Sequence, residues 1–264
     1  MMPVTAIRSL FRTALAATVA LALAGCASGR NGTGQEEVYD PLEVPNRFVF
    51  AMNDAADILV IRPAAEIYAG AVPDPVRNAV QNILETLLAP LVIGNSLLQG
   101  DGQNASDATG RFMTNAILGL GGVFDVASTA GIPAYRTEDF GQTLGVWGVG
   151  EGPYLVLPLI GRSNARDALG YGVDTVADPF RIATSAANAN GVLYSRSAAS
   201  AVDTRSRLLR EVDDMRRSSV DFYAAARSLY HQQRNASIRN STSAGTPEFP
   251  EFPEDAKPNI SPLR

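Results

Sequence analysis

Prolines interrupt the apolar stretches of this sequence and limit how long any of its helices can be. Proline fixes its own φ and has no amide hydrogen, so it suits the first turn of a helix and disrupts the interior. Asp40-Pro41 and Asp74-Pro75 each combine a capping residue with a proline, which predicts two helix starts. After the first start, apolar residues recur at steps of three and four, at Val44, Phe48, Met52, Ala55 and Leu59. This spacing predicts an amphipathic helix that ends at Arg62-Pro63, where another helix can start.

A second apolar stretch contains a proline near its middle. Val76, Val80, Ile83 and Leu87 follow Asp74-Pro75 at helical spacing, and Pro90 then falls inside the apolar run from Leu87 to Ile93. We expect Pro90 to break the helix. The apolar segment is too short to cross a bilayer, so two interpretations stay open: it belongs to a core, or it dips into one membrane leaflet.

Two long patterns occupy the second half of the chain. Between Gly148 and Gly161, Pro153 and Pro158 exclude a regular helix and argue against a central strand, which predicts an extended or hairpin-like apolar loop. From Leu208 to Arg234, apolar residues recur at alternating steps of four and three, which predicts one long helix. Convincing β patterns are scarce, so the fold class is mainly α.

The N-terminal segment has the features of an export signal. Arg8 and Arg12 precede an apolar stretch, residues 13–23, which has the length of a signal-peptide core and is too short to span a bilayer. Leu23-Ala24-Gly25-Cys26 then resembles a bacterial lipobox, and Cys26 is the only cysteine. We predict that residues 1–25 are a cleaved signal peptide, that Cys26 carries the lipid anchor, and that residues 26–38 form a flexible tether. Ala27 after the cysteine points to the outer membrane.

Composition excludes several classes of function. A net charge of −5, from 22 basic and 27 acidic residues, argues against a general nucleic-acid binder. One cysteine and one histidine, His231, argue against a Cys/His zinc site and a Cys-His dyad. Lys257 is the only lysine, which excludes a phosphate-binding loop of the G-x-x-x-x-G-K-[ST] type. We therefore predict no metal, no cofactor and no enzymatic activity.

Three candidate sites for chemistry have ordinary structural interpretations. His231 lies on the predicted last helix, where we expect it to be solvated. The segment from Asp101 to Asp107 resembles a calcium loop only faintly, because it lacks the glycine and the final acidic residue, so a loop with a helix cap is expected. Glu138 and Asp139 are adjacent and would point in different directions on a helix, which argues against a shared acid role.

Arginine outnumbers lysine 21 to 1. Guanidinium groups bind phosphate through two parallel N–H groups, so arginines near hinges or helix starts are candidates for phosphate contact. The arginines in such positions are Arg62, Arg111, Arg136, Arg162 and Arg166. An ordinary intramolecular ion pair is the alternative for each of them.

Short motifs are spread over almost the whole chain, from Tyr39 to Arg234. They include Asp40-Pro41-Leu42-Glu43, Leu98-Gln99-Gly100-Asp101, Ile117-Leu118-Gly119-Leu120-Gly121-Gly122, Arg136-Thr137-Glu138-Asp139-Phe140-Gly141-Gln142-Thr143-Leu144-Gly145 and Gly148-Val149-Gly150-Glu151-Gly152-Pro153-Tyr154. Each motif is weak alone, but the combination resembles the VacJ/MlaA family of outer-membrane lipoproteins. Val44-Pro45 departs from that pattern, because relatives commonly carry glycine and an aromatic residue there.

The resemblance implies a single ring-like helical domain, residues 39–234, lying in one membrane leaflet around an amphipathic channel. Such a protein removes phospholipids that strayed into the outer leaflet. It works beside a trimeric porin and passes the lipid to a periplasmic carrier protein. With the periodicity, this predicts a long C-terminal helix, and the proline-rich composition of residues 235–264 predicts a disordered tail.

The channel residues are predicted from hinge chemistry, because non-helical backbone at membrane depth is tolerated where it lines a cavity. Candidates for the channel or its gate are Gly119, Gly121, Gly122, Trp147, Gly150 and Tyr154. Candidates for headgroup contact are Arg62, Arg111, Arg136 and Arg166. Two other functions stay open: a structural envelope lipoprotein that scaffolds porins without moving lipid, and a lipid-cleaving enzyme. The absence of a G-x-S-x-G motif weighs against the enzyme.

Overall fold

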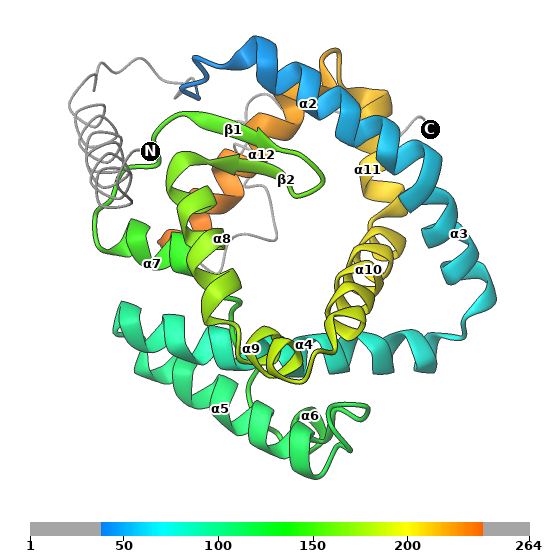
Figure 1. Ribbon diagram of the computed structural model, residues 1–264, viewed down its shortest axis with the longest axis vertical. Helices are drawn as coiled ribbons and strands as arrows, with labels where there is room; N and C mark the ends of the chain where they lie inside the picture. Colours follow the sequence, from blue (N-terminus) through cyan, green and yellow to red (C-terminus); the bar gives the residue numbers. More distant parts are fainter. Residues whose placement is uncertain (1–37, 240–264) are drawn as a thin grey trace, which may run out of the picture.

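The computed structural model describes residues 38–239. The predicted signal peptide, Cys26 and most of the predicted tail lie outside the described residues. Figure 1 shows helices arranged as a ring, with one short hairpin. In chain order the elements are α2 (Glu43–Ala56), η2 (Asp57–Ile61), α3 (Arg62–Ala71), α4 (Asp74–Gln99), α5 (Gly102–Ile117), α6 (Val126–Thr129), α7 (Phe140–Val146), β1 (Tyr154–Leu157), β2 (Gly161–Asn164), α8 (Ala165–Ala177), α9 (Pro179–Ala186), α10 (Asn190–Arg207), α11 (Leu209–Ser218) and α12 (Phe222–Ile238).

The predicted mainly α fold class is confirmed, and the predicted apolar loop forms an antiparallel hairpin. Tyr154 pairs with Asn164 at one end of β1 and β2, and Leu157 pairs with Gly161 at the other. Pro153 precedes the hairpin and Pro158 lies in its turn, so neither proline removes a hydrogen bond from the ladder. Figure 1 shows the tip of the hairpin pointing toward the middle of the ring.

The predicted break of the helix at Pro90 does not occur. The helix α4 continues through Pro90, and Ala89 and Val92 on either side of it are buried. Packing against neighbouring elements thus outweighs the local cost of an interior proline. At Arg62-Pro63 a new helix, α3, starts with the proline in its first turn, but no loop separates it from the preceding helix. The chain instead widens into the π-helical turn η2, in which the amide of Arg62 donates to the carbonyl of Asp57.

The predicted long helix from Leu208 to Arg234 is wrong. The chain forms two helices in this region, α11 and α12, and α12 extends to Ile238, beyond the predicted end of the domain. Ser219 is extended, with φ −88° and ψ 133°, and the carboxylate of Asp221 accepts a hydrogen bond from the amide of Ala224. Asp221 therefore caps a new helix in the middle of the apolar repeat.

The apolar core is small. It centres on Tyr154, Val156 and Tyr223, against which Phe50 and Tyr230 pack. The rings of Tyr154 and Tyr223 meet edge to face with centroids 6.1 Å apart. Most other buried positions in the described chain are alanine or carry polar side chains.

Ion pairs join the first helices of the chain to the last ones and close the ring. On η2 and α2, Asp57 and Asp54 face α10 and α11: Arg205 Nε lies 2.8 Å from Asp57 Oδ1, and Arg216 Nη1 donates to Asp54 Oδ2 at 2.8 Å. Further pairs of the same kind join Arg47 to Asp221 at 2.6 Å and Arg227 to Asp40 at 2.8 Å. Because the apolar core is small, these charge-assisted bonds fix how the two ends of the domain meet.

Within residues 38–239, no helix combines the length and the apolar character needed to cross a membrane.

Candidate functional site

A cavity of about 620 Å³ lies among η2, the hairpin turn, α8, α9 and α10. These elements surround the middle of the ring in Figure 1. The residues that line the cavity are Asp57, Ile61, Leu159, Ile160, Tyr171, Thr175, Asp178, Arg181, Leu193, Arg196, Ser197, Ser200, Ala201, Thr204, Arg205 and Leu208. This volume is in the range of cavities that hold small molecules or parts of larger amphiphiles.

The wall of the cavity is amphipathic. The hairpin turn contributes the apolar side chains of Leu159 and Ile160, while α10 contributes hydroxyl groups, including those of Ser200 and Thr204. Charged side chains come from η2, α8–α9 and α10. A polar group and a hydrocarbon chain could therefore both find matching surroundings in the same cavity.

Two asparagines of α2 hold the hairpin in place. Asn46 Nδ2 donates to the carbonyl of Tyr154 at 2.9 Å, and the amide of Val156 donates back to Asn46 Oδ1 at 2.9 Å. Asn53 repeats this arrangement two helical turns later: Nδ2 donates to the carbonyl of Leu157 at 2.9 Å, and Oδ1 accepts from the amide of Leu159 at 2.8 Å. Each amide side chain thus pairs with β1 as a neighbouring strand would. Asn53 fixes the hairpin tip, where Leu159 has a φ of +62°.

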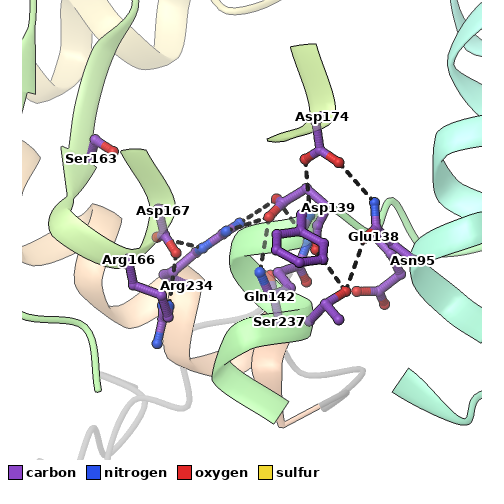
Figure 2. Close-up of polar contacts among 12 residues, drawn as sticks. Asn95, Glu138, Asp139, Gln142, Ser163, Arg166, Asp167, Asp174, Arg234 and Ser237 are labelled. Carbon is purple, nitrogen blue, oxygen red and sulfur yellow. Dashed lines mark hydrogen bonds and ion pairs between the residues drawn. The ribbon is translucent and has the colours of Figure 1, made fainter. Parts of the chain in front are cut away.

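A smaller chamber of about 190 Å³ adjoins the cavity and shares Ile160 and Tyr171 with it. Figure 2 shows the polar network beside this chamber, where α7, α8 and α12 meet. Arg234 holds Asp139 by two hydrogen bonds of 2.6 Å, and its Nε lies 2.7 Å from Asp167 Oδ2. Asp174 accepts from Asn95 at 3.0 Å and from the amide of Phe140 at 2.9 Å.

The pKa values of the carboxylates in this region are shifted in opposite directions. Burial raises the pKa of Asp139, but the hydrogen bonds and charge of Arg234 outweigh it and hold this pKa below its ordinary value. Burial raises the pKa of Asp174 and of Glu138. Because Asp139 also caps α7 by accepting from the amide of Gln142, the network joins helices together rather than presenting a free acid or base.

The model of the MlaA lipoprotein family matches residues 38–237, nearly all of the described chain. The chain belongs to the MlaA lipoprotein family. The resemblance expected from the sequence motifs is thereby confirmed.

Named relatives and a solved structure agree with this membership. The intermembrane phospholipid transport system lipoprotein MlaA of Escherichia coli (strain K12) is 38% identical over 216 residues, which cover 81% of this chain and 83% of the relative. Its counterpart in Haemophilus influenzae is 31% identical over 224 residues, covering 81% and 84%. A chain solved in work on the structural basis for maintenance of bacterial outer membrane lipid asymmetry matches with a TM-score of 0.67 and 33% identity, covering 75% of this chain and 98% of that chain.

In this MlaA-family fold, the predicted glycine turn lies away from the cavity. Gly119, Gly121 and Gly122 follow α5, and a Cβ atom at Gly122 would collide with the side chain of Thr86 on α4. Gly122 therefore allows α4 and the turn to approach closely.

The other predicted channel residues also lie elsewhere. Trp147 ends α7 and donates its indole N–H to the carbonyl of Leu98 at 3.0 Å, Gly150 lies in the loop before β1, and Tyr154 is buried in the core. Within the described chain, none of the six predicted channel residues lines the cavity, so a gating role for them stays a prediction. The loop predicted with them does contribute Leu159 and Ile160.

The four candidate headgroup arginines all form ion pairs. Arg111 lies 2.9 Å from Asp125, and Arg166 lies 2.9 Å from Asp167. Arg62 contacts Glu66 and Asp213, each at 2.9 Å, and Arg136 contacts Asp101. Phosphate contact by these arginines stays a prediction, and none of the four lines the cavity among the described residues.

Asp101 and His231 both have defined partners in the structure. Asp101 caps α5 by accepting from the amide of Asn104 at 3.0 Å, which confirms a loop with a helix cap. The solvated position expected for His231 is wrong: its side chain is 12% exposed, and Nε2 lies 3.0 Å from Glu151 Oε1. The loop before β1 covers this part of α12, which a helical pattern alone does not reveal.

Sequence reasoning missed Asn53 and most of the cavity wall. Asn46 and Asn53 are seven residues apart, the spacing of one helix face, and this repeat was the available signal. The cavity face of α10 carries Arg196, Ser200 and Thr204 at steps of four, but this polar stripe has no motif.

Proposed function

We propose that this MlaA-family chain is an outer-membrane lipoprotein that removes mislocalised phospholipids from the outer leaflet and thereby maintains lipid asymmetry. Lipid passes through the central cavity, without covalent chemistry, and is handed to a periplasmic carrier protein. The names of the Escherichia coli and Haemophilus influenzae relatives, and the subject of the structural work on the solved relative, support this assignment. Anchoring through Cys26 and work beside a trimeric porin are parts of the proposal that rest on the lipobox and on the family.

The observation that carries the proposal is the inverted distribution of polar and apolar residues. Large apolar side chains around the ring are more than half exposed, including Phe48, Leu59, Ile67, Val176 and Ile182. Buried positions in the described residues are instead largely polar or charged. An exposed apolar surface of this extent is unfavourable in water and is expected of a protein that lies in hydrocarbon.

The cavity supports transport because it offers a charged headgroup a polar route. Moving a charged group through the centre of a bilayer costs from several to over ten kcal/mol. Polar and charged side chains that line a cavity at membrane depth replace part of the lost hydration. With the acyl chains against the apolar part of the wall or in the surrounding lipid, the headgroup alone needs the polar part.

Closing the cavity tests this function. Ser200→Trp places a large side chain in the cavity wall, and Ser195→Trp places the same side chain on α10 outside the wall. We expect cells that carry only the first variant to show as much surface-exposed phospholipid as cells without the protein. The second variant should restore the low wild-type level at equal expression.

A scaffold that moves no lipid predicts a different result. In that case, Ser200→Trp would restore normal lipid asymmetry as fully as Ser195→Trp does. This outcome would contradict the proposed transport route.

A further inference from the structure

The charged side chains in the wall of the central cavity do not balance. Two aspartates and three arginines line it, so the wall carries one more positive than negative charge; these residues are Asp57, Asp178, Arg181, Arg196 and Arg205. A carboxylate carries one negative charge and a guanidinium carries one positive charge. A surplus charge inside a cavity favours a ligand of the opposite sign.

Two of the three arginines already neutralise the two aspartates. Arg205 donates to both carboxylate oxygens of Asp57, from Nε at 2.8 Å and from Nη2 at 3.1 Å. Arg196 Nη1 donates to Asp178 Oδ2 at 2.6 Å, and its guanidinium lies over the ring of Phe180 at 4.9 Å. The surplus positive charge therefore belongs to Arg181, for which residues 38–239 provide no ion pair.

The neighbouring chamber does not supply a partner either. Its three carboxylates are Asp139, Asp167 and Asp174. Arg234 holds the first two, and Asn95 and a backbone amide hold the third. These groups are engaged in joining helices.

The position of Arg181 is not one that stabilises its own helix. It lies in the first turn of α9, where the helix dipole disfavours a cation. The next residue, Ile182, is 57% exposed and is absent from the cavity wall. The helix α9 thus carries an apolar side chain outside the cavity and a cation in its wall.

We infer that Arg181 binds the phosphate group of the transported lipid and makes the cavity select phosphate-bearing amphiphiles over neutral ones. The inference rests on the proposed function. A phosphodiester carries one negative charge, which matches the surplus, and a guanidinium holds phosphate oxygens with parallel N–H groups. The hydroxyl groups of Ser200 and Thr204 in the same wall offer further donors.

The test compares lipid binding by four forms of the full-length protein purified in detergent, measured by native mass spectrometry. The probes are dioleoyl phosphatidylglycerol and dioleoylglycerol, which share acyl chains, and inorganic phosphate. We expect the wild type to prefer phosphatidylglycerol about tenfold, as for a hydrogen bond to a charged group. Arg181→Gln should lose this preference, and Arg181→Lys should keep most of it. Arg210→Gln, which removes an exposed arginine of α11 outside the cavity, should match the wild type.

The binding results distinguish a failure of the proposed function from a failure of the inference about Arg181. A wild type that holds neither lipid contradicts the proposed function itself. A wild type that prefers phosphatidylglycerol while Arg181→Gln keeps the same preference overturns only the inference. Inorganic phosphate that binds through Arg181 and is not displaced by phosphatidylglycerol identifies a site for free phosphate, which also overturns it.

Discussion

At the scale of single residues, side chains perform tasks that backbone usually performs. Asn46 of α2 donates to and accepts from the edge of β1, and Asn53 does the same at the end of β1 and the turn that follows it, so the two-stranded hairpin gains part of a third strand. A hairpin of two strands is marginal by itself in water. We therefore attribute the fixed position of the hairpin tip to these asparagines.

Replacing Asn53 tests this role. Asn53→Ala removes both hydrogen bonds to the hairpin tip, and the expected loss is about 1–2 kcal/mol of folding free energy. Hydrogen exchange at the amide of Leu159 should become faster, because that amide loses its acceptor. Asn78→Ala, an exposed position on α4, serves as the control and should leave this amide unchanged. Equal exchange rates in all three proteins would show that Asn53 does not hold the tip.

Acid should weaken one of the ring-closing contacts in a defined pH range. The hydrogen bonds from Arg47 lower the pKa of Asp221 to about 2, and the amide of Ala224 adds to this effect. Because the folded pKa is below the unfolded value of about 4, the contribution to stability is complete above pH 4 and is lost as the pH falls toward 2. Asp221→Asn keeps the helix cap but removes the charge.

We expect this variant to be less stable than the wild type at pH 7, by about 0.5–1 kcal/mol, as for an exposed pair. Urea unfolding should show the difference shrinking between pH 4 and pH 2. A difference that stays constant over this range would mean that the charge of Asp221 does not stabilise the fold.

At the scale of elements, the sequence predicts where helices occur better than where they end. The apolar spacing located the helices at Val44–Leu59 and Val76–Leu87, because one buried face imposes a period near 3.6. Pro90 misled the prediction of a helix end, since tertiary packing accommodates it. Arg62-Pro63 does mark the start of α3, although a π-helical turn joins that helix directly to α2. The repeat from Leu208 to Arg234 predicted one continuous helix, but Asp221 caps a new helix inside this repeat. The apolar spacing continues across the break and therefore hides it.

Substitutions at two glycines of α8 test how closely this helix packs against α7. A Cβ atom at Gly170 would lie 2.5 Å from Gly141 Cα, whereas a Cβ atom at Gly172 would meet nothing within 4 Å. Gly170→Ala should therefore force the helices apart and destabilise the protein by about 1–3 kcal/mol. Gly172→Ala should stabilise it by about 0.5–1 kcal/mol, because alanine loses less backbone entropy in a helix. Thermal unfolding measures both, and shifts of the same sign would contradict this packing.

At the scale of the whole molecule, the ring depends on contacts that a single sequence does not reveal. Asp57 and Arg205 lie 148 positions apart in the sequence, whereas each motif covers only a short segment. Nothing in the local sequence around either residue indicates that the two form an ion pair. For the same reason, the hinge residues chosen as channel candidates are separated from the cavity, whose wall is assembled from η2, the hairpin turn and α8 to α10. The sequence motifs did predict the family correctly, because they extend over the whole domain.

The central claim is that the outer surface of the ring faces hydrocarbon while its cavity is hydrated. Thr175 and Val176 are adjacent on α8: the first lines the cavity, and the second is 76% exposed and absent from the cavity wall. One spin label at a time, on Thr175→Cys or Val176→Cys of the protein in bilayers, can report collisions with oxygen, which partitions into lipid, and with a water-soluble nickel chelate. We predict that the label at Val176 collides mainly with oxygen and the label at Thr175 mainly with nickel. Equal, high nickel accessibility at both positions would contradict the account.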